Sequence, residues 1–211
     1  MIKILVADDH AIVREGLKQI VSEEGDMSVT GEAKDSMELF TLLKKGTWDI
    51  IVLDINMPGK SGLDALKEIK SNHPTIPVLI LSMYSEEQYG IRAIRAGASG
   101  FLKKVSAPEE LVSAIRKIVS GGKYISDALA DKLVTHLGSS VKKMSHESLS
   151  DRELQILCQI ASGMSAEQIA DDLSISIHTV YSYRNRILDK MNMKSNVELT
   201  QYAIQNNLIQ L

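Results

Sequence analysis

The sequence lacks most of the features that mark secreted, membrane-spanning or thiol-based metal proteins. Its single cysteine, Cys158, cannot form a disulfide within the chain, which fits a reducing compartment. No apolar run approaches the roughly 18 residues that a membrane span needs. The chain opens directly into an apolar strand and shows no signal peptide. We therefore expect a soluble, cytoplasmic protein that makes no contact with a membrane.

Aromatic residues are also scarce, at 4% of the chain, so the core must be built mainly from aliphatic side chains. Hydrophobic residues make up 44% of the 211 positions. A chain of this length and composition can bury the cores of two small domains.

Apolar strands alternate with amphipathic helices from residue 1 to about residue 124. This fivefold repeat predicts an α/β fold with a five-stranded parallel sheet, doubly wound in the flavodoxin-like order 2-1-3-4-5. The predicted strands are residues 2–7, 29–33, 50–53, 78–81 and 100–102, and the main predicted helices are residues 36–45, 62–72, 86–96 and a last helix opened by Pro108.

Three acidic residues follow two of these strands. The third strand runs straight into Asp54, and the first strand runs into Asp8 and Asp9. In the order 2-1-3-4-5 these strands are neighbours, so the three carboxylates should meet at one edge of the sheet. Carboxylates this close repel one another unless a cation intervenes, and an oxygen-lined site with room for water suits Mg2+. Taken alone, Asp54 could equally be a turn residue before the next helix.

Residues at the ends of the other strands fit an anionic group beside that metal. Ser82 follows the fourth strand, and Lys103 and Lys104 follow the fifth. A phosphoryl group on Asp54 would need a hydroxyl donor and a cation, because phosphoryl transfer depends on positioning and charge stabilisation. Each residue has a more common role when considered alone, the serine as a cap and the lysines as solvated charge.

This set of residues resembles the receiver domain of bacterial two-component response regulators. The resemblance covers residues 3 to about 122, and it includes Asp54 in the motif Leu-Asp-Ile-Asn-Met-Pro-Gly. It implies that Asp54 accepts a phosphoryl group from a sensor histidine kinase. It also implies that Asp9, Asp54 and the backbone carbonyl of Asn56 bind Mg2+, with Asp8 acting through water.

The same resemblance assigns the residues that respond to the phosphoryl group. Ser82 and Lys104 would hold its oxygen atoms, and Phe101 would be the switch aromatic. Lys104 is preferred to Lys103 because the family lysine lies three residues after that aromatic. The family often has a proline after this lysine, commonly with a cis bond, whereas Val105 stands here. A cis bond before valine would cost about 3 kcal/mol.

In the rest of the chain, the apolar residues recur at helical spacing. Residues 127–137 predict a helix, residues 138–145 a polar linker, and the remaining segments a small all-α domain. Ser150 and Ser165 each begin a capping-box pattern, and Ser176 can cap a longer helix from His178 to Met191. A short helix, a tight turn and a longer helix indicate a helix-turn-helix, although a plain helical bundle has the same periodicity. The expected domains are residues 1–124, a linker at 125–146, and residues 147–211.

The distribution of charge favours a helix-turn-helix over a plain helical bundle. Residues 147–211 contain five basic and eight acidic side chains, but four of the basic ones lie between Arg184 and Lys194. Positive charge is thus concentrated on the expected recognition helix and its exit, where DNA phosphates would lie. This segment also resembles the LuxR-type helix-turn-helix of NarL/FixJ-like regulators. The matches include Leu149-Ser-Asp-Arg-Glu153, Ile169-Ala170, Thr179-Val180 and Arg184.

The expected DNA contacts follow from position and residue type. The side chains near the helix start that point away from its buried face should read bases, and the basic or hydroxyl-bearing ones should bind phosphates. Lysine and histidine are common in the family where this chain has Tyr181 and Tyr183. The predicted base readers are Tyr181, Ser182 and Asn185, and the predicted phosphate contacts are Thr179, Tyr183, Arg184, Arg186 and Lys190.

Three classes of function therefore compete. The first is a transcription factor that is switched by phosphorylation, binds promoter DNA as a homodimer and contacts RNA polymerase. It would not be an enzyme beyond phosphorylating and dephosphorylating itself. The second is an aspartyl-phosphate phosphatase, but such enzymes usually carry a second acid where this chain has Asn56. The third is a flavodoxin-like nucleotide binder, in which Asp8 and Asp9 would repel a phosphate group unless a metal were bound.

Overall fold

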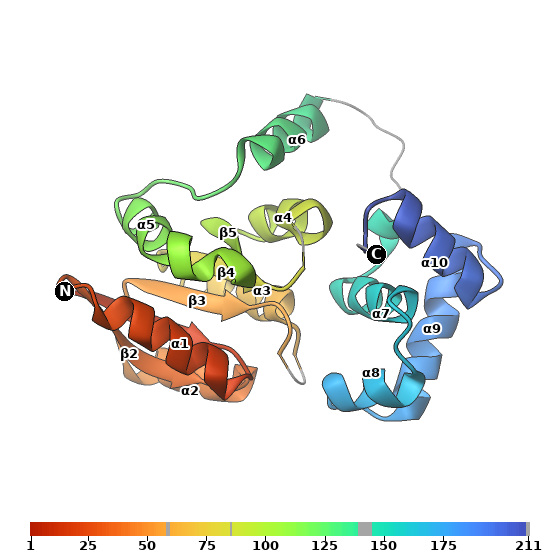
Figure 1. Ribbon diagram of the computed structural model, residues 1–211, viewed down its shortest axis with the longest axis horizontal. Coiled ribbons are helices and arrows are strands. Elements are labelled where there is room, and N and C mark those ends of the chain that lie inside the picture. Colours follow the sequence, from red (N-terminus) through yellow and green to blue (C-terminus); the bar gives the residue numbers. More distant parts are fainter. Residues whose placement is uncertain (58–59, 85, 139–144, 210–211) are drawn as a thin grey trace. The chain divides into compact units, whose positions relative to one another are not determined.

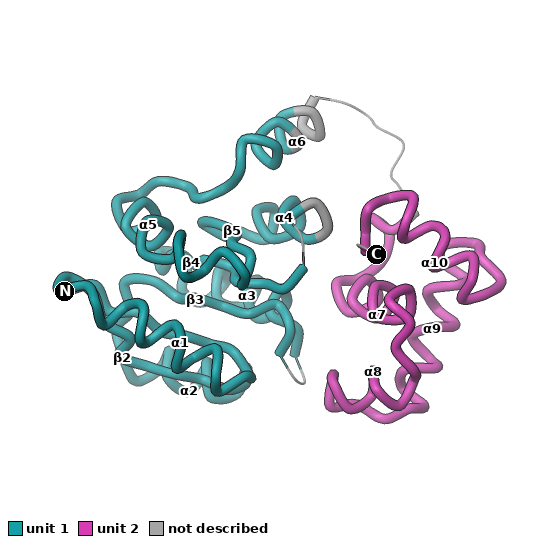
Figure 2. The backbone as a smooth tube through the Cα atoms, in the orientation of Figure 1, with its two compact units in different colours: residues 1–134 teal, residues 135–211 magenta. Residues whose placement is uncertain are grey.

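The chain forms two compact units, which are considered separately. The computed structural model describes residues 1–57, 60–84, 86–138 and 145–209. The first unit is Met1–Val134 and the second is Thr135–Leu211 (Figure 2). Among the described residues, no helix combines the length and the apolar character required to cross a membrane.

The first unit is a parallel five-stranded sheet with helices on both faces (Figure 1). The strand order is β2-β1-β3-β4-β5, which confirms the predicted doubly wound fold. The strands are β1 Ile2–Ala7, β2 Met27–Ala33, β3 Ile50–Asp54, β4 Val78–Ser82 and β5 Gly100–Lys103. The helices are α1 Ala11–Ser22, α2 Ser36–Lys45, α3 Gly62–Asn72, α4 Glu86–Arg95 and α5 Ala107–Val119, with a short 3-10 turn, η1, at Lys104–Ser106.

An aliphatic core holds the sheet against α1 and α5. Leu17 of α1 and Leu111 of α5 belong to one buried cluster with Ile4, Val52 and Leu79 of the three inner strands. Every residue of β3 and β4 is buried, as expected for strands covered on both faces. The ends of these strands are therefore where their polar side chains lie.

The third, fourth and fifth strands extend further than the hydrophobic pattern predicts, into the polar residues that follow it. Asp54 is the last residue of β3 and pairs with Leu81, while Ser82 ends β4 and pairs with Lys103. Backbone ladder pairing does not require an apolar side chain, so it continues where the hydrophobic pattern stops. The sheet backbone itself thus fixes the positions of Asp54 and Ser82.

The segment after α5 pairs with β5, the edge strand of the sheet. The Phe101 amide donates to the Tyr124 carbonyl at 2.9 Å, and the Tyr124 amide donates to the Ser99 carbonyl at 3.0 Å. The next helix, α6 (Asp127–Gly138), buries Leu129 to 2% exposure, and a Cβ on Gly90 of α4 would lie 2.8 Å from Leu129 Cδ2. The start of the expected linker is thus packed on the first unit, which extends to Val134.

The second unit is helical throughout its described residues. It contains the 3-10 turn η2 at Ser145–Ser148, followed by α7 Asp151–Ala161, α8 Ala166–Asp172, α9 Ile177–Met191 and α10 Asn196–Gln205. The predicted capping boxes at Ser150 and Ser165 are both present, and Ser176 Oγ accepts the Thr179 amide at 3.1 Å. The helix predicted from His178 begins one residue earlier. Residues 139–144, in the predicted polar linker, lie outside the described residues.

The turn between β3 and α3 leaves no room for a side chain at Gly62. A Cβ there would lie 2.7 Å from Ile55 Cα and closer still to the Asp54 carbonyl oxygen. We predict that Gly62→Ala lowers the free energy of unfolding by about 1–3 kcal/mol, because backbone atoms must move to relieve the clash. Urea denaturation measures this change.

Gly16 provides the matched control for that substitution. It also lies in a helix, α1, but a Cβ at this position would have no heavy atom within 4 Å. Gly16→Ala should therefore raise the free energy of unfolding by about 0.5–1 kcal/mol through helix propensity alone. Equal effects of the two substitutions would contradict the close approach at Gly62.

Candidate functional site

Three acidic side chains meet at the carboxyl edge of the sheet. Ala7 of β1 pairs with Leu53 of β3, so the residues that follow these two, Asp8 and Asp54, lie side by side. Both are buried, at 1% exposure, whereas Asp9 is partly exposed. A carboxylate oxygen from each of the three, together with a ring nitrogen of His10, lies within 4.8 Å of the others.

Lys104 reaches into this acidic pocket and contacts two of the carboxylates. Its Nζ lies 2.7 Å from Asp8 Oδ2 and 2.8 Å from Asp54 Oδ2. Lys103 instead ends β5. Among the described residues there is no cis peptide bond, so the bond between Lys104 and Val105 is trans. The lysine that the spacing selects is thus the one that contacts Asp54.

Electrostatics in the acidic pocket leave negative charge to be neutralised. Burial raises the pKa of Asp54 to about 7; Lys104 opposes this shift, while Asp8 adds to it. Burial alone would lower the pKa of Lys104, but its carboxylate partners raise it. Asp54 Oδ1 is buried and has no hydrogen-bond partner. One lysine faces three carboxyl groups, and a divalent cation would favour the ionised form of Asp54, so the residues fit such a cation.

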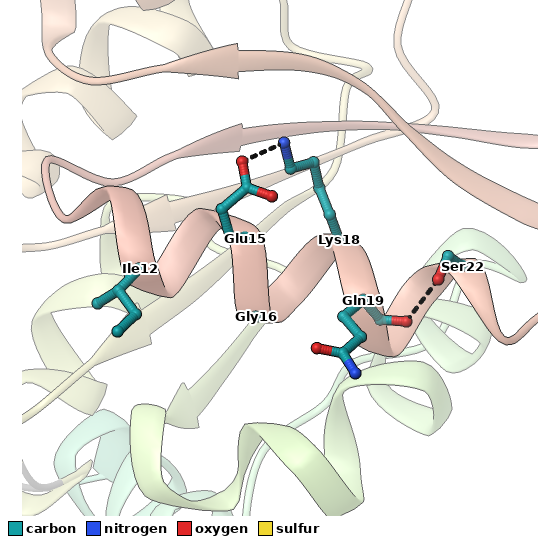
Figure 3. Close-up of a pocket in the computed structure, with 6 residues that line it drawn as sticks. All are labelled: Ile12, Glu15, Gly16, Lys18, Gln19 and Ser22. Atoms are coloured by element: carbon teal, nitrogen blue, oxygen red, sulfur yellow. Dashed lines mark hydrogen bonds and ion pairs between the residues drawn. The ribbon is translucent and has the colours of Figure 1, made fainter.

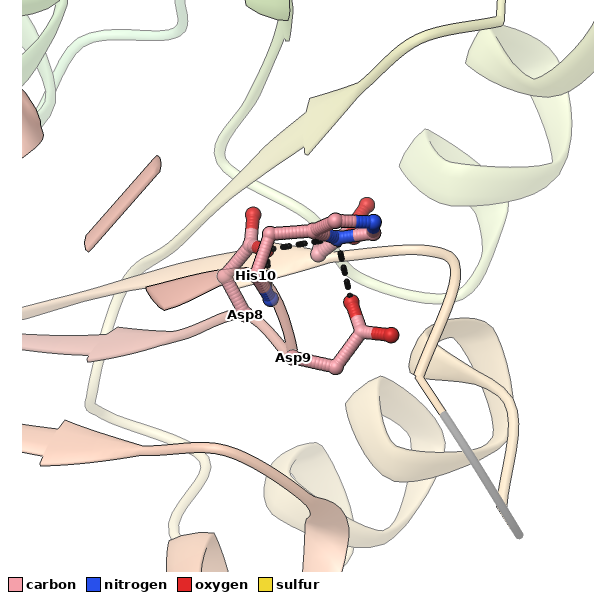
Figure 4. A group of neighbouring side chains, drawn as sticks. Asp8, Asp9 and His10 are labelled. Atoms are coloured by element: carbon pink, nitrogen blue, oxygen red, sulfur yellow. Dashed lines mark hydrogen bonds and ion pairs between the residues drawn. The ribbon is translucent and has the colours of Figure 1, made fainter. Parts of the chain in front are cut away.

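Contacts from α1 hold the loop that carries the first two acids. The Arg14 guanidinium donates to the Asp8 carbonyl at 2.7 Å and to Glu32 Oε2 at 3.3 Å. The His10 amide donates to Asp8 Oδ1 at 2.9 Å, and the His10 ring lies beside both Asp8 and Asp9 (Figure 4). The motifs in the sequence assign no role to His10. A histidine at a helix N-cap, where serine, threonine, asparagine or aspartate is usual, is the signal that would have identified it.

The remaining predicted residues lie on β4, on β5 and in the loop after β3. Ser82 is fully buried at the end of β4, where its Oγ accepts the Tyr84 amide at 3.0 Å. Phe101 is buried on β5, and Asn56 lies in the loop after β3. The structure therefore places a hydroxyl group, a lysine and three carboxylates around one edge of the sheet.

A separate shallow hollow lies on the surface of α1, over Gly16 (Figure 3). Its main cation, Lys18 Nζ, is already bound to Glu15 Oε1 at 2.6 Å and to Glu32 Oε1 at 2.8 Å. The hollow offers no convergent set of reactive groups, in contrast to the acidic pocket. Its lining residues are Ile12, Glu15, Gly16, Lys18, Gln19 and Ser22.

In the second unit, α9 buries one face and exposes the other. Val180 and Ile187 are buried, while the three predicted base readers, Tyr181, Ser182 and Asn185, are exposed. The exposed face carries a shallow hollow, and its lining residues are His178, Thr179, Ser182, Tyr183 and Arg186.

The predicted phosphate contacts do not form one uniform basic strip. Arg186 is exposed, with its guanidinium 5.9 Å from the centre of the Tyr183 ring. Arg184 Nε donates to Asn196 Oδ1 at 2.6 Å, which links α9 to α10. Lys190 Nζ lies 2.7 Å from Glu153 Oε2, an oxygen that also accepts the Ser150 amide. The charge of Lys190 is therefore partnered within the protein, which the sequence pattern does not reveal.

Two family models match the chain, one to each unit. Residues 4–116 match the response regulator receiver domain, and residues 147–203 match the bacterial regulatory proteins of the luxR family. The chain is similar over almost its whole length to the oxygen regulatory protein NreC of Staphylococcus carnosus, with 36% identity covering 98% of this chain and 99% of NreC. It is 34% identical to the response regulator UvrY of Escherichia coli K12, covering 99% of this chain and 96% of UvrY.

Solved structures show the same architecture. RcsB from Salmonella enterica serovar Typhimurium, bound to promoter rprA in the presence of a phosphomimetic, matches with a TM-score of 0.65 and 25% identity over 96% of this chain and 98% of RcsB. The response regulator ChrA matches with a TM-score of 0.52 and 31% identity over 99% of this chain and 98% of ChrA. This chain therefore belongs to the NarL/FixJ-type two-component response regulators, DNA-binding transcription regulators with an amino-terminal receiver domain and a carboxyl-terminal LuxR-type helix-turn-helix domain.

Proposed function

We propose that Asp54 accepts a phosphoryl group from a sensor histidine kinase, and that this modification controls promoter binding by α9. The observation that carries the proposal is the environment of Asp54, which is buried beside Asp8 and bound to Lys104 on one oxygen only. Asp54 Oδ1 is left without a hydrogen-bond partner. It is the oxygen we assign as the nucleophile.

The protein side chains have separate roles in this transfer. Asp54 Oδ1 would attack phosphorus, the N–P bond of the donor would break, and the imidazole of the kinase would leave with the bonding electrons. Lys104 would balance charge on the phosphoryl oxygens, and the Ser82 hydroxyl, whose oxygen accepts the Tyr84 amide, still has its own hydrogen to donate. We assign Asp8, Asp9, Asp54 and the Asn56 carbonyl to Mg2+, which when bound neutralises charge on the same oxygens.

The exposed start of α1 is the surface that a kinase would meet next to the acidic pocket. Helix α1 begins two residues after Asp9, and Ile12 in its first turn is 83% exposed. Ile12 lies three residues after Asp9 in the chain, so a partner that reaches the acidic pocket would also meet it. We assign this surface to the kinase.

The second unit would bind promoter DNA through the exposed face of α9. Tyr181, Ser182 and Asn185 are assigned to base edges, and the exposed Arg186 is assigned to a phosphate contact. The other proposed phosphate contacts are Thr179, Tyr183, Arg184 and Lys190. Arg184 and Lys190 also contact Asn196 and Glu153 within the protein, so each would bind a phosphate in addition to that partner. RcsB dimers bound to DNA support a homodimer as the binding form. We propose residues 147–211 as the DNA-binding domain and RNA polymerase as a further partner.

The first prediction of this proposal concerns the phosphoacceptor. Asp54→Asn keeps the side-chain volume and removes the nucleophile, so treatment with acetyl phosphate and a divalent cation should label the wild type once and leave the variant unlabelled. Intact-protein mass spectrometry measures the label. Asp9→Asn is the comparison, because it should slow labelling without removing the acceptor. Full labelling of Asp54→Asn would contradict the proposal.

The second prediction follows from the raised pKa of Asp54. An unfolded aspartate has a pKa of about 4, so between about pH 4 and pH 7 the folded protein binds more protons at this group. Without metal, the contribution of Asp54 to the free energy of unfolding should fall as the pH rises through this window. Mg2+ should restore stability most above pH 7, where Asp54 is ionised. Urea denaturation of wild type and Asp54→Asn isolates this contribution, and parallel pH curves would contradict it.

The third prediction separates base contacts from phosphate contacts. Asn185→Ala should relax base preference at one position per half-site, at a cost of about 1–3 kcal/mol. Arg186→Ala should weaken binding to all DNA sequences alike. It should also reduce the slope of log K against log salt concentration by about one unit. Lys44→Ala, which removes an exposed charge from the receiver, is the control and should change neither.

Lys190 needs a separate measurement because of its ion pair with Glu153. Lys190→Ala should lower stability as well as DNA affinity, and denaturation curves recorded alongside the binding assay separate the two effects. If Arg184, Arg186 and Lys190 were all replaced by alanine without loss of DNA affinity, the assignment of α9 to DNA would be wrong.

A further inference from the structure

The proposed phosphotransfer chemistry makes no use of His10, although this side chain lies at the acidic pocket. His10 Nδ1 is 2.7 Å from Asp9 Oδ1 and 3.3 Å from Asp8 Oδ1 (Figure 4). It occupies the N-cap of α1, where its side chain makes no capping hydrogen bond. The imidazole therefore faces the two carboxylates and does not serve the helix terminus.

The position of His10 is fixed by the loop that fixes the acids. The His10 backbone amide donates to Asp8 Oδ1, and Arg14 binds the Asp8 carbonyl. A simple surface ion pair would account for contact with one carboxylate, whereas this nitrogen lies within 4.8 Å of ligand oxygens from Asp8, Asp9 and Asp54.

The two oxygens of Asp8 face different side chains. Oδ2 contacts Lys104, and Oδ1 faces His10. The side of the acidic pocket that includes His10 is thus distinct from the side that Lys104 occupies. Asp54, itself 1% exposed, contributes an oxygen without a hydrogen-bond partner, so the pocket has an unused buried ligand atom.

We propose that His10 is a metal ligand, and that the acidic pocket binds a divalent transition metal such as Mn2+ through this imidazole in addition to its carboxylates. The inference rests on the proposed cation site and specifies which metals it accepts. Mg2+ takes oxygen ligands and keeps several waters, so an imidazole adds little to its binding. Transition metals accept imidazole nitrogen readily.

The test compares two metals on the full-length protein. Calorimetric titration should show that His10→Ala weakens Mn2+ binding by about 10- to 100-fold, while Mg2+ affinity changes less than about twofold. Electron spin-echo measurements of bound Mn2+ should show coupling to an imidazole 14N nucleus in the wild type and not in His10→Ala. The matched control is His73→Ala. His73 is the C-cap residue of α3, at the end of that helix opposite to Gly62, and its replacement should retain both the Mn2+ affinity and the 14N coupling.

Asp54→Asn distinguishes failure of this inference from failure of the cation site itself. If Asp54→Asn weakens both metals but His10→Ala changes Mn2+ and Mg2+ affinity by the same factor, or leaves the 14N coupling intact, then His10 is not a ligand and the inference is overturned. If Asp54→Asn binds both metals as tightly as the wild type, the acidic pocket is not the cation site, and both proposals fall. His10 is exposed, so its replacement should leave the metal-free melting curve unchanged.

Discussion

Two buried carboxylates, Asp8 and Asp54, share the ammonium group of Lys104, and the first unit depends on this arrangement. Burying ionised groups is costly unless they are paired. Here Asp54 ends one inner strand, Asp8 directly follows another, and the lysine directly follows the edge strand, so the three charged groups are paired. Gly62 then lets the chain turn back against the Asp54 backbone. The receiver therefore gathers two buried carboxylates around one ammonium group, so Lys104 alone does not neutralise the pocket when both are ionised.

That shortage of positive charge makes the acidic pocket responsive. Lys104 contacts both Asp8 and Asp54, and it directly follows β5, the strand that carries Phe101. The chemistry at Asp54 and the position of β5 are thus physically linked through a single side chain.

The sequence predicted the parts of this structure that depend on hydrophobic period and capping chemistry. The sheet order, the capping boxes at Ser150 and Ser165, and the buried face of α9 all follow from such local signals. What it could not predict is which partner a side chain contacts in the folded protein. Lys190 meets Glu153 across 37 positions, and His10 meets the acids only because its side chain does not cap α1. The positions of Asp54 and Ser82 at the carboxyl ends of β3 and β4 agree with the sequence prediction, because each polar residue directly follows a short apolar run.

The pairing of Tyr124 with β5 affects how receivers of this kind can be exchanged between proteins. In the sequence, the Gly121-Gly122 pair looks like a domain boundary. Truncation there would remove Tyr124, whose backbone carbonyl accepts the Phe101 amide, and would uncover the sheet edge. It would also remove Leu129, which is buried in the intact unit. An open edge is a template for association with another chain. The natural module for transplantation therefore ends inside α6, near Val134, where the compact unit itself ends.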